Sequence, residues 1–448
     1  MAAEESKVTR AEATLKLFRS KLKEGFVPSS IFHDPEIFEL EKDRIFTKAW
    51  MFLGHESEIP KPGDYVVRYI VDDSFIVVRD ENNSVQVLFN SCSHRGMQIC
   101  NVEMGNASHF RCPYHGWTYK NTGNLVGVPF GKELYGEGLK REEWGLRTAA
   151  RFETYHGMIF ACLDPNAVSL DEYLGGFKWY LDIYLKKGEN GLEVVGAPQR
   201  WVVDADWKLG SDNFIGDGYH TGVSHRSTIE VGVLPGPNAD FHKEGVQVYA
   251  DPGGAGFIYS PPQTFNGYPP NIVESMKNNL TPEHIQLMLG NENYHMFPSH
   301  AGMFPNLSFL NAPAIVEEGG FPVPYLTMRT WNPIGPGKIE LWSWFLVEKD
   351  APDWFKEASY RAYVLTFGTS GTLEQDDTEN WRSISKVAKG SMARDHFLNY
   401  QMGMASGIKP LTDWPGPGTA YPKAYLEANS RSFYGKYLEY MDRGQEAF

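Results

Sequence analysis

Four metal-binding side chains in two short segments constrain this chain more than any other feature. The segments read N-S-C-S-H-R-G and R-C-P-Y-H-G-W, and they pair Cys92 with His94 and Cys112 with His115. The spacing is C-x-H, then 17 residues, then C-x-x-H. Each segment lies between predicted strands, so each loop offers one thiolate and one imidazole. The fold must therefore bring two loops together around one inorganic centre.

Two kinds of centre can use these ligands. Zinc is one, because sites of two Cys and two His are common, but zinc fingers usually pair like with like. A Rieske [2Fe–2S] cluster needs two thiolates on one iron and two imidazoles on the other, which alternating Cys and His pairs deliver. Gly96 and Gly116 follow the ligands and permit close approach of the backbone. The pattern favours the Rieske cluster and leaves zinc as the alternative.

Three further residues near this pattern are interpreted as structural. His109 lies between the two pairs at a spacing that matches neither, and is expected to be an ordinary surface or strand histidine. Cys100 and Cys162 are expected to be small buried side chains. The chain has only four cysteines, too few for a disulfide scaffold at this length.

The cluster loops belong to a predicted all-β domain over residues 40–158. Runs such as DYVVRYI, SFIVVRD and SVQVLFN are β-branched and aromatic, and turn signals separate them. Residues 1–39 predict a helical segment that packs on the second domain, which follows the β domain. Helices are expected over 8–24 and 34–46, the second capped by Asp34.

Residues 159–448 predict a second domain of the α+β class, with an antiparallel sheet and helices against it. PYLTMRTWNP and KIELWSWFLVEKD are strand candidates joined by the turn IGPG, whereas DWFKEASYRAYVLTFG and the segment after Gly371 have helical patterns. Residues 234–270 are rich in Gly and Pro and predict long loops near a pocket.

A second set of metal ligands is expected in DNFIGDGYHTGVSH. His220 and His225, with one carboxylate, would leave open positions on Fe(II) for O2. On a helix, Asn213, Asp217 and His220 would form one stripe, with Asp217 hydrogen-bonded to the outer nitrogen of His220. The two histidines can share a metal only if the helix ends or bulges between them, which Gly222 would allow.

The carboxylate must come from elsewhere in the sequence. The segment E-Q-D-D-T-E-N at 374–380 is the best acidic cluster, at a predicted helix start. Its structural alternative is a solvated first turn, where acidic residues favour the helix dipole.

Composition narrows the function classes. The net charge of -14 disfavours nucleic acid and anionic membranes as partners. No signal peptide and no run of about 18 apolar residues is visible, so a soluble, reducing, cytoplasmic setting is expected. The 14% of aromatic residues fits either a Trp- and Tyr-rich core or a pocket for a flat apolar ligand.

The sequence resembles the large (α) subunits of Rieske non-haem iron aromatic-ring-hydroxylating dioxygenases. It is most similar to the naphthalene-type and polycyclic-hydrocarbon enzymes, particularly those of actinobacteria. The similarity covers nearly the whole chain and includes CSHRGMQ, HFRCPYHGWTY, DNFIGDGYHTGVSH, FLVEKDAPDWFK and FGTSGTLEQDD.

The resemblance implies roles for the metal-binding residues. It implies that the four Cys and His residues above bind the cluster, and that His220, His225 and Asp377 bind a mononuclear iron. It further implies that Asp217 bridges His115 of one subunit and His220 of its neighbour. Asn213 matches a polar residue beside the iron.

The resemblance also places a substrate pocket. Phe214, His300, Phe367 and Leu373 match positions that line it. Leu373 is a departure, because naphthalene-type enzymes carry Trp there, and the smaller side chain suggests a roomier or reshaped pocket.

The family implies a fold, an assembly and a reaction. Its fold pairs a β-rich Rieske domain with a helix-grip-like catalytic domain, usually in α3β3 hexamers with a small β subunit, although α3 trimers occur. A ferredoxin and an NADH-dependent flavin reductase supply electrons. The expected reaction adds both atoms of O2 to an aromatic hydrocarbon, giving a cis-dihydrodiol. The alternatives are a dioxygenase for an aromatic carboxylate such as phthalate or salicylate, which an Arg or Lys in the pocket would mark, and a plain electron-transfer protein.

Overall fold

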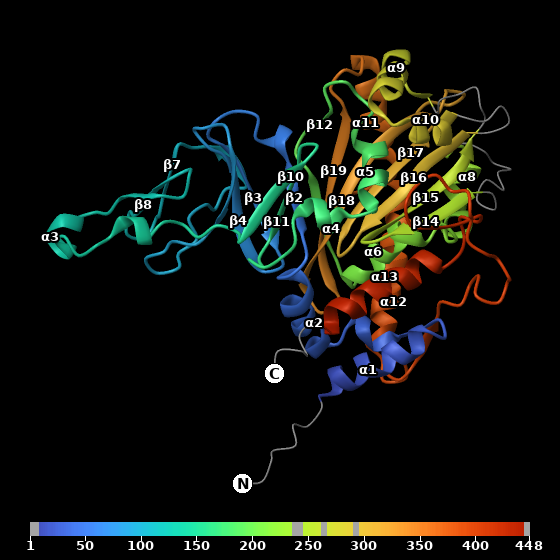
Figure 1. Cartoon of the computed structure of the whole chain (residues 1–448), viewed down its shortest axis with the longest axis horizontal. Coiled ribbons are helices and arrows are strands. Elements are labelled where there is room, and N and C mark those ends of the chain that lie inside the picture. The colour runs from blue at the N-terminus through green and yellow to red at the C-terminus, as the bar shows by residue number, and fades with distance from the viewer. Residues whose placement is uncertain (1–8, 235–244, 261–266, 290–294, 443–448) are drawn as a thin grey trace, which may run out of the picture. The chain divides into compact units, whose positions relative to one another are not determined.

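The computed structural model describes residues 9–234, 245–260, 267–289 and 295–442 (Figure 1). The chain divides into two compact units, Phe46–Leu170 and the remainder, Met1–Ile45 with Asp171–Phe448. The sequence placed the limits of the β-rich domain at 40 and 158. In the structure the strand that begins at Met158 pairs with the first strand of the smaller unit and therefore belongs to it.

The smaller unit is built from short antiparallel strands in three sheets. Their orders are β5-β4-β3-β6, β7-β8-β9 and β10-β11-β2. The strands are β2 (Met51–His55), β3 (Asp64–Ile70), β4 (Asp73–Arg79), β5 (Val85–Phe89), β6 (Met104–Asn106), β7 (His109–Arg111), β8 (Thr118–Lys120), β9 (Leu125–Gly127), β10 (Arg151–Tyr155) and β11 (Met158–Cys162), with one short helix, α3 (Gly131–Tyr135). The three predicted β-branched runs therefore form β3, β4 and β5, as expected.

The core of the smaller unit continues into the predicted cluster loops. Cys92 and Cys112 are buried in one hydrophobic cluster with Cys100, Trp117 and Tyr119. Cys100 and Cys162 are both free and buried, which confirms their structural interpretation. His109 lies exposed on β7, also as expected.

The larger unit is organised by one antiparallel sheet, which has nine strands within the described ranges. Its order is β12-β19-β18-β17-β16-β15-β14-β21, and β13 also pairs with β19. The strands are β12 (Leu192–Val194), β13 (Gln199–Val203), β14 (Gly245–Ala250), β15 (Gly253–Ser260), β16 (His295–Met303), β17 (Leu307–Ala314), β18 (Val323–Gly335), β19 (Lys338–Glu348) and β21 (Thr419–Tyr421). The predicted hairpin with the turn IGPG is β18–β19, and the predicted α+β class is confirmed.

Helices pack against this sheet and against each other (Figure 1). They are α1 (Arg10–Leu22), α2 (Pro35–Glu41), α4 (Leu170–Leu174), α5 (Phe177–Leu185), α6 (Trp207–Gly216), α7 (Thr221–Ser224), α8 (Arg226–Glu230), α9 (Pro270–Asn279), α10 (Pro282–Leu289), α11 (Asp353–Phe367), α12 (Thr372–Ala388) and α13 (Ala428–Asp442). The short strands β1 (Phe26–Pro28) and β20 (Phe397–Asn399) pair with each other. Helix α6 contacts β15 to β18, α13 packs on α6, and α1 packs on α13.

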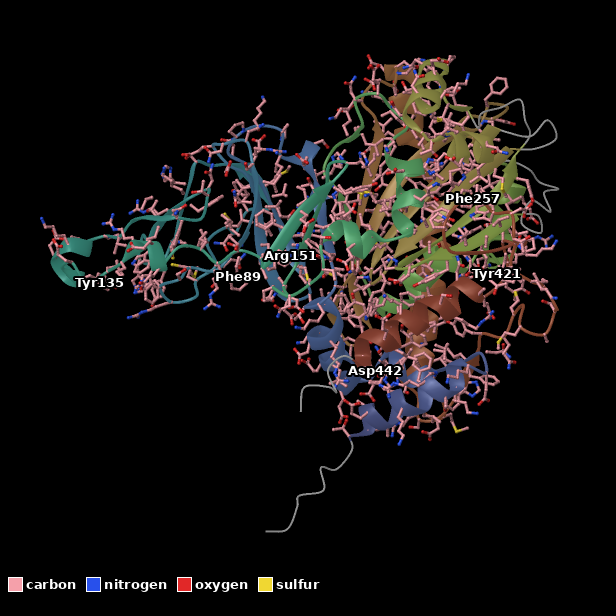
Figure 2. All side chains as sticks on the ribbon, in the orientation of Figure 1. Phe89, Tyr135, Arg151, Phe257, Tyr421 and Asp442 are labelled. Atoms are coloured by element: carbon pink, nitrogen blue, oxygen red, sulfur yellow. The ribbon has the colours of Figure 1, made fainter. Side chains whose placement is uncertain are left out.

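Aromatic side chains fill much of the space beside the sheet. Phe257 lies on β15 in the larger unit (Figure 2). Its ring centroid is 6.1 Å from that of Tyr180 and 5.4 Å from that of Trp414. Trp207, Trp331 and Trp344 are fully buried. Many of the aromatic residues therefore belong to the hydrophobic core, as the interpretation of a Trp- and Tyr-rich core expected.

The prediction of long loops over residues 234–270 is wrong for a large part of that range. Residues 245–250 and 253–260 form β14 and β15, while 235–244 and 261–266 lie outside the described residues. The glycines make room for neighbouring groups. A Cβ on Gly254 would lie 2.8 Å from the carbonyl oxygen of Ile215 on α6, and one on Gly256 would lie 2.2 Å from the ring of His300. Glycine here permits close packing within a strand and does not mark a loop.

The predicted helices near the N-terminus are confirmed as α1 and α2. The side chain of Asp34 accepts a hydrogen bond from the backbone nitrogen of Glu36 at 2.9 Å, which is the expected cap. Both helices belong to the larger unit. Every helix within the described ranges is too short or too polar to span a bilayer.

Candidate metal centres

The two loops of the smaller unit adopt the same turn. Gly96 donates its backbone N–H to the carbonyl oxygen of Cys92 at 2.8 Å, and Gly116 donates to that of Cys112 at 3.0 Å. Both glycines have positive φ, 73° and 74°, a conformation that side chains with a Cβ disfavour. The sequence C-x-x-x-G therefore builds a matched pair of loops, each ending its tight turn at glycine.

The four side chains in these loops are arranged for a cluster of two metals. The cysteines are buried, the rings of His94 and His115 lie 4.6 Å apart, and Nδ1 of His94 is buried without a hydrogen-bond partner. The two thiols adjoin each other and the two imidazoles adjoin each other, so each pair could hold one iron of a [2Fe–2S] cluster, as the alternating pattern predicts.

Tyr119 provides a hydrogen bond at the buried end of this centre. Its hydroxyl lies 3.2 Å from the sulfur of Cys92 and accepts from the backbone N–H of Ser93 at 3.2 Å. A cluster-bound thiolate has no proton to donate, so with a cluster present the Tyr119 hydroxyl would be the donor to the sulfur. Without a metal, burial raises the pKa of the Cys92 thiol, and the hydrogen bond from Tyr119 partly offsets this rise. Sequence reasoning missed Tyr119. The signal was its spacing: in a strand, residues two apart lie on the same face, so Tyr119 should be buried together with Trp117.

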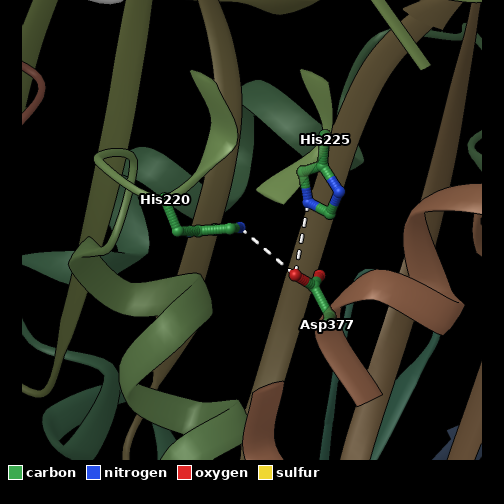
Figure 3. Close-up of side chains that lie close together, drawn as sticks. All are labelled: His220, His225 and Asp377. Carbon is green, nitrogen blue, oxygen red and sulfur yellow. Dashed lines mark ion pairs between the residues drawn. The ribbon is translucent and has the colours of Figure 1, made fainter. Parts of the chain in front are cut away.

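The second centre lies in the larger unit (Figure 3). Nε2 of His220 lies 3.3 Å from Oδ1 of Asp377, and Nε2 of His225 lies 3.2 Å from the same oxygen. Within the described ranges, these three residues form the one group of three or more potential ligands whose atoms lie within 4.8 Å of one another. Residues from two distant segments therefore meet around one point.

The local backbone explains how the two histidines converge. Helix α6 ends at Gly216, and Asp217 leaves the helical region with φ -94° and ψ 68°. His220 and His225 then stand at the two ends of the short α7, with ring centroids 5.1 Å apart. The expectation of one helical stripe through Asn213, Asp217 and His220 is therefore wrong. Gly222 is not the break either: it lies inside α7, and the helix ends after it.

The electrostatics of Asp377 fit a divalent cation. Its side chain is 1% exposed, and neither carboxylate oxygen has a hydrogen-bond partner. Burial alone would raise the pKa of Asp377, but the imidazoles of His220 and His225 outweigh it and hold this pKa well below its usual range. A buried carboxylate needs positive charge beside it, and together with the two imidazole nitrogens Asp377 would make a ligand set that suits iron.

A carboxylate supports each histidine from behind. Nδ1 of His220 lies 2.5 Å from the backbone oxygen of Asp217 and 3.4 Å from its Oδ2. Nδ1 of His225 lies 3.1 Å from Oδ2 of Asp376. Such contacts fix the ring orientation of metal-binding histidines. Sequence reasoning placed Asp217 here and missed Asp376, although the Asp-Asp pair on one helix was the signal.

The expected pocket residues are largely buried around this centre. Phe214 and Phe367 contact each other at 6.0 Å between centroids, and Leu373 is buried one turn before Asp377. His300 lies across from Gly256, with Nδ1 at 3.0 Å from the Ser299 hydroxyl and Nε2 buried without a partner. Burial and the nearby His220 charge lower the pKa of His300 to about 4, so its ring is neutral at neutral pH. Asn213 is half-buried on α6.

Comparison with protein families matches both units. Residues 49–140 match the Rieske [2Fe–2S] domain, and residues 170–443 match the ring hydroxylating alpha subunit (catalytic domain). The chain is 37% identical to the biphenyl 2,3-dioxygenase subunit alpha of Rhodococcus jostii, over 93% of this chain and 89% of that protein. It is 36% identical to the N,N-dimethyl phenylurea N-demethylase subunit alpha of Sphingobium sp., over 93% and 92% respectively.

A solved structure is similar over nearly the full length. The naphthalene 1,2-dioxygenase from Rhodococcus sp., crystallised with indole, is 49% identical. It superimposes with a TM-score of 0.92, covering 97% of this chain and 99% of that one.

Proposed function

The chain belongs to the ring-hydroxylating alpha subunits, which combine a Rieske [2Fe–2S] domain with a catalytic domain that uses mononuclear non-haem iron, and we propose that it cis-dihydroxylates aromatic hydrocarbons. The overall reaction takes the arene, O2, NADH and a proton to the cis-dihydrodiol and NAD⁺. The observation that carries the proposal is the convergence of His220, His225 and Asp377 on one point.

The residues of this chain hold and orient the iron. In the proposal, His220, His225 and Asp377 bind it and leave positions open, and the bound iron supplies the site at which O2 is activated. Asp217 fixes the ring of His220 through Nδ1. The Asp217 side chain is 40% exposed, so its carboxylate can also meet His115 of the partner subunit. This is the electron path that the family resemblance implies.

An apolar pocket suits a flat hydrocarbon without polar groups. Phe214, Phe367 and Leu373 bury apolar surface, at about 25 cal/mol per Å2 removed from water. The neutral ring of His300 adds no charge. Such surfaces exclude water from the reacting ring and hold the arene by burial.

The aromatic-carboxylate alternative needs a cation that is free to bind the substrate. Beside the pocket phenylalanines, Arg329 is buried, but it forms an ion pair with Glu374. Within the part of the chain that the structure describes, this cation is neutralised, which favours a neutral substrate.

The proposal includes the partners of the family. A small β subunit in an α3β3 assembly, a ferredoxin and an NADH-dependent flavin reductase complete the system, and the setting is cytoplasmic. The net charge of -14 is compatible with a setting away from nucleic acid and anionic membranes, and the family supports the partners.

The deciding experiment is a reconstituted reaction with isotopically labelled O2. Purified protein with a family reductase and ferredoxin is incubated with naphthalene, biphenyl, phthalate, salicylate and an N,N-dimethyl phenylurea. We expect cis-diols of the hydrocarbons that carry two labelled oxygen atoms from one O2. Conversion of the aromatic acids alone, or N-demethylation alone, would replace the proposed function. Iron analysis gives three irons per chain for the oxygenase and two for an electron carrier.

A further inference from the structure

Arg329 is a charged residue in the centre of the larger unit that none of the roles above uses. It lies on β18 and is 0% exposed. Its guanidinium forms an ion pair with Glu374, which is 1% exposed, and donates from its second nitrogen to the backbone oxygen of Phe367 at 2.6 Å. One side chain on the sheet therefore joins the end of α11 to the first turn of α12.

The same guanidinium lies against both phenylalanines of the candidate pocket. Its Cζ is 4.6 Å from the ring centroid of Phe367 and 5.5 Å from that of Phe214. A cation within about 6 Å of an aromatic ring is attracted to the ring face. Because Arg329 is buried and two of its nitrogens are bonded, it offers both rings a cation at a defined position.

Glu374 connects Arg329 to the iron carboxylate. It lies three residues before Asp377 on α12 and accepts a hydrogen bond from the Thr378 hydroxyl at 3.1 Å. It also follows Leu373 directly. The ion pair thus sets the position of the helical turn that carries one pocket residue and one candidate iron ligand.

We propose that Arg329 is a positioning residue that fixes Asp377 and the Phe214–Phe367 wall together, and so determines which bond of a neutral aromatic ring faces the iron. This rests on the proposed function. The guanidinium is bonded to the backbone of Phe367 and to Glu374, and Glu374 lies one turn before Asp377 on α12, so the pocket wall and the candidate iron ligand share one anchor. Lysine cannot replace it, since a single ammonium on a flexible stem lacks the planar fork of donors that bonds Glu374 and the Phe367 carbonyl at once.

The test separates positioning from stability. A buried ion pair often contributes little to stability relative to apolar groups of similar size, so the pair is removed as a unit by Arg329→Met with Glu374→Leu. Arg329→Lys retains the charge. The matched control is Arg68→Met with Glu58→Leu, which removes a buried ion pair of the smaller unit whose side chains are 6% and 5% exposed.

Three quantities are measured on each protein: the melting temperature, the rate of Fe(II) release to a chelator, and the ratio of diol isomers from a substituted naphthalene. For both Arg329 variants we expect Fe(II) release to be faster and the isomer ratio to shift, each on the order of tenfold. The control should change the melting temperature alone. If the paired variant does not fold, Arg329→Lys decides.

An Arg329→Lys protein that folds and matches the wild type in both Fe(II) release and isomer ratio would overturn the proposal. A shift of equal size in the control would also overturn it, because any buried ion pair would then have the same effect. If the wild type forms no diol, the proposed function fails, and Fe(II) release still decides whether Arg329 positions Asp377.

Discussion

His220 is held by Asp217 through two different oxygens. Nδ1 of His220 lies 2.5 Å from the backbone oxygen of Asp217 and 3.4 Å from a carboxylate oxygen. The backbone contact orients the ring, and the carboxylate adds negative charge on the side away from Asp377. These two contributions can be separated by mutation.

Asp217→Asn removes the charge and keeps the backbone contact. We expect the variant to retain the cluster and the mononuclear iron, while turnover falls by about tenfold to hundredfold. Iron per chain and product formation are measured on the same preparation. Near-normal turnover would contradict a role for the Asp217 charge in the reaction.

His220→Ala removes a candidate iron ligand. The visible spectrum of the cluster should persist, because its four candidate ligands lie in the other unit, whereas the mononuclear iron and activity should be lost. His109→Ala, at an exposed strand position, is the control and should change neither. Loss of the cluster spectrum in His220→Ala would show that the assignment is wrong.

The affinity of metal-free protein for Fe(II) should rise with pH. Burial would lower the pKa of His220, but the carboxylates of Asp377 and Asp217 outweigh it and raise this pKa well above its usual value. Fe(II) must displace that proton, so affinity should fall by up to about tenfold for each pH unit below the raised pKa. Titration of the chelator-treated protein with Fe(II) across the neutral range measures the slope. An Fe(II) affinity that does not change with pH would contradict the displacement of a proton from His220.

Tyr119→Phe should lower the reduction potential of the cluster by on the order of tens of millivolts. A hydroxyl that donates to a ligand sulfur stabilises the reduced cluster, which carries more negative charge, so its loss favours the oxidised state. Tyr65→Phe is a matched control, because the Tyr65 hydroxyl forms a hydrogen bond with the sulfur of Cys100, which is not a candidate cluster ligand. Redox titration followed by visible absorption measures the reduction potential of the cluster in both variants. Equal shifts in the two variants would refute a specific effect of the Tyr119–Cys92 hydrogen bond.

Leu373→Trp should narrow the substrate range. Leu373 is buried, so the larger ring must occupy pocket space or displace its neighbours. We expect three-ring arenes to lose kcat/KM by about tenfold or more relative to benzene. Competition between arenes of different size in one reaction measures this ratio. An unchanged ratio would place Leu373 outside the pocket wall.

Local sequence determined much of the smaller unit. The loop from Cys92 to Gly96 and the loop from Cys112 to Gly116 are each complete within five residues, and their turns depend on glycine and on backbone hydrogen bonds inside the loop. Alternation and turn residues likewise predicted β3 to β5 and the β18–β19 hairpin, because these patterns are read over a few neighbouring positions.

Only the tertiary structure decided how the second centre is built. His225 and Asp376 are separated by 151 positions, and the sheet with α6 and α12 brings them to hydrogen-bonding distance. Long-range packing also explains why the glycine-rich segment at 253–256 is a strand and not a loop. Ile215 and His300 lie so close to this strand that only glycine fits there. Arg329 gave no signal in sequence for the same reason: its partners, Phe214, Phe367 and Glu374, are distant along the chain. Periodicity records which face of an element is buried, but not which distant residue covers that face.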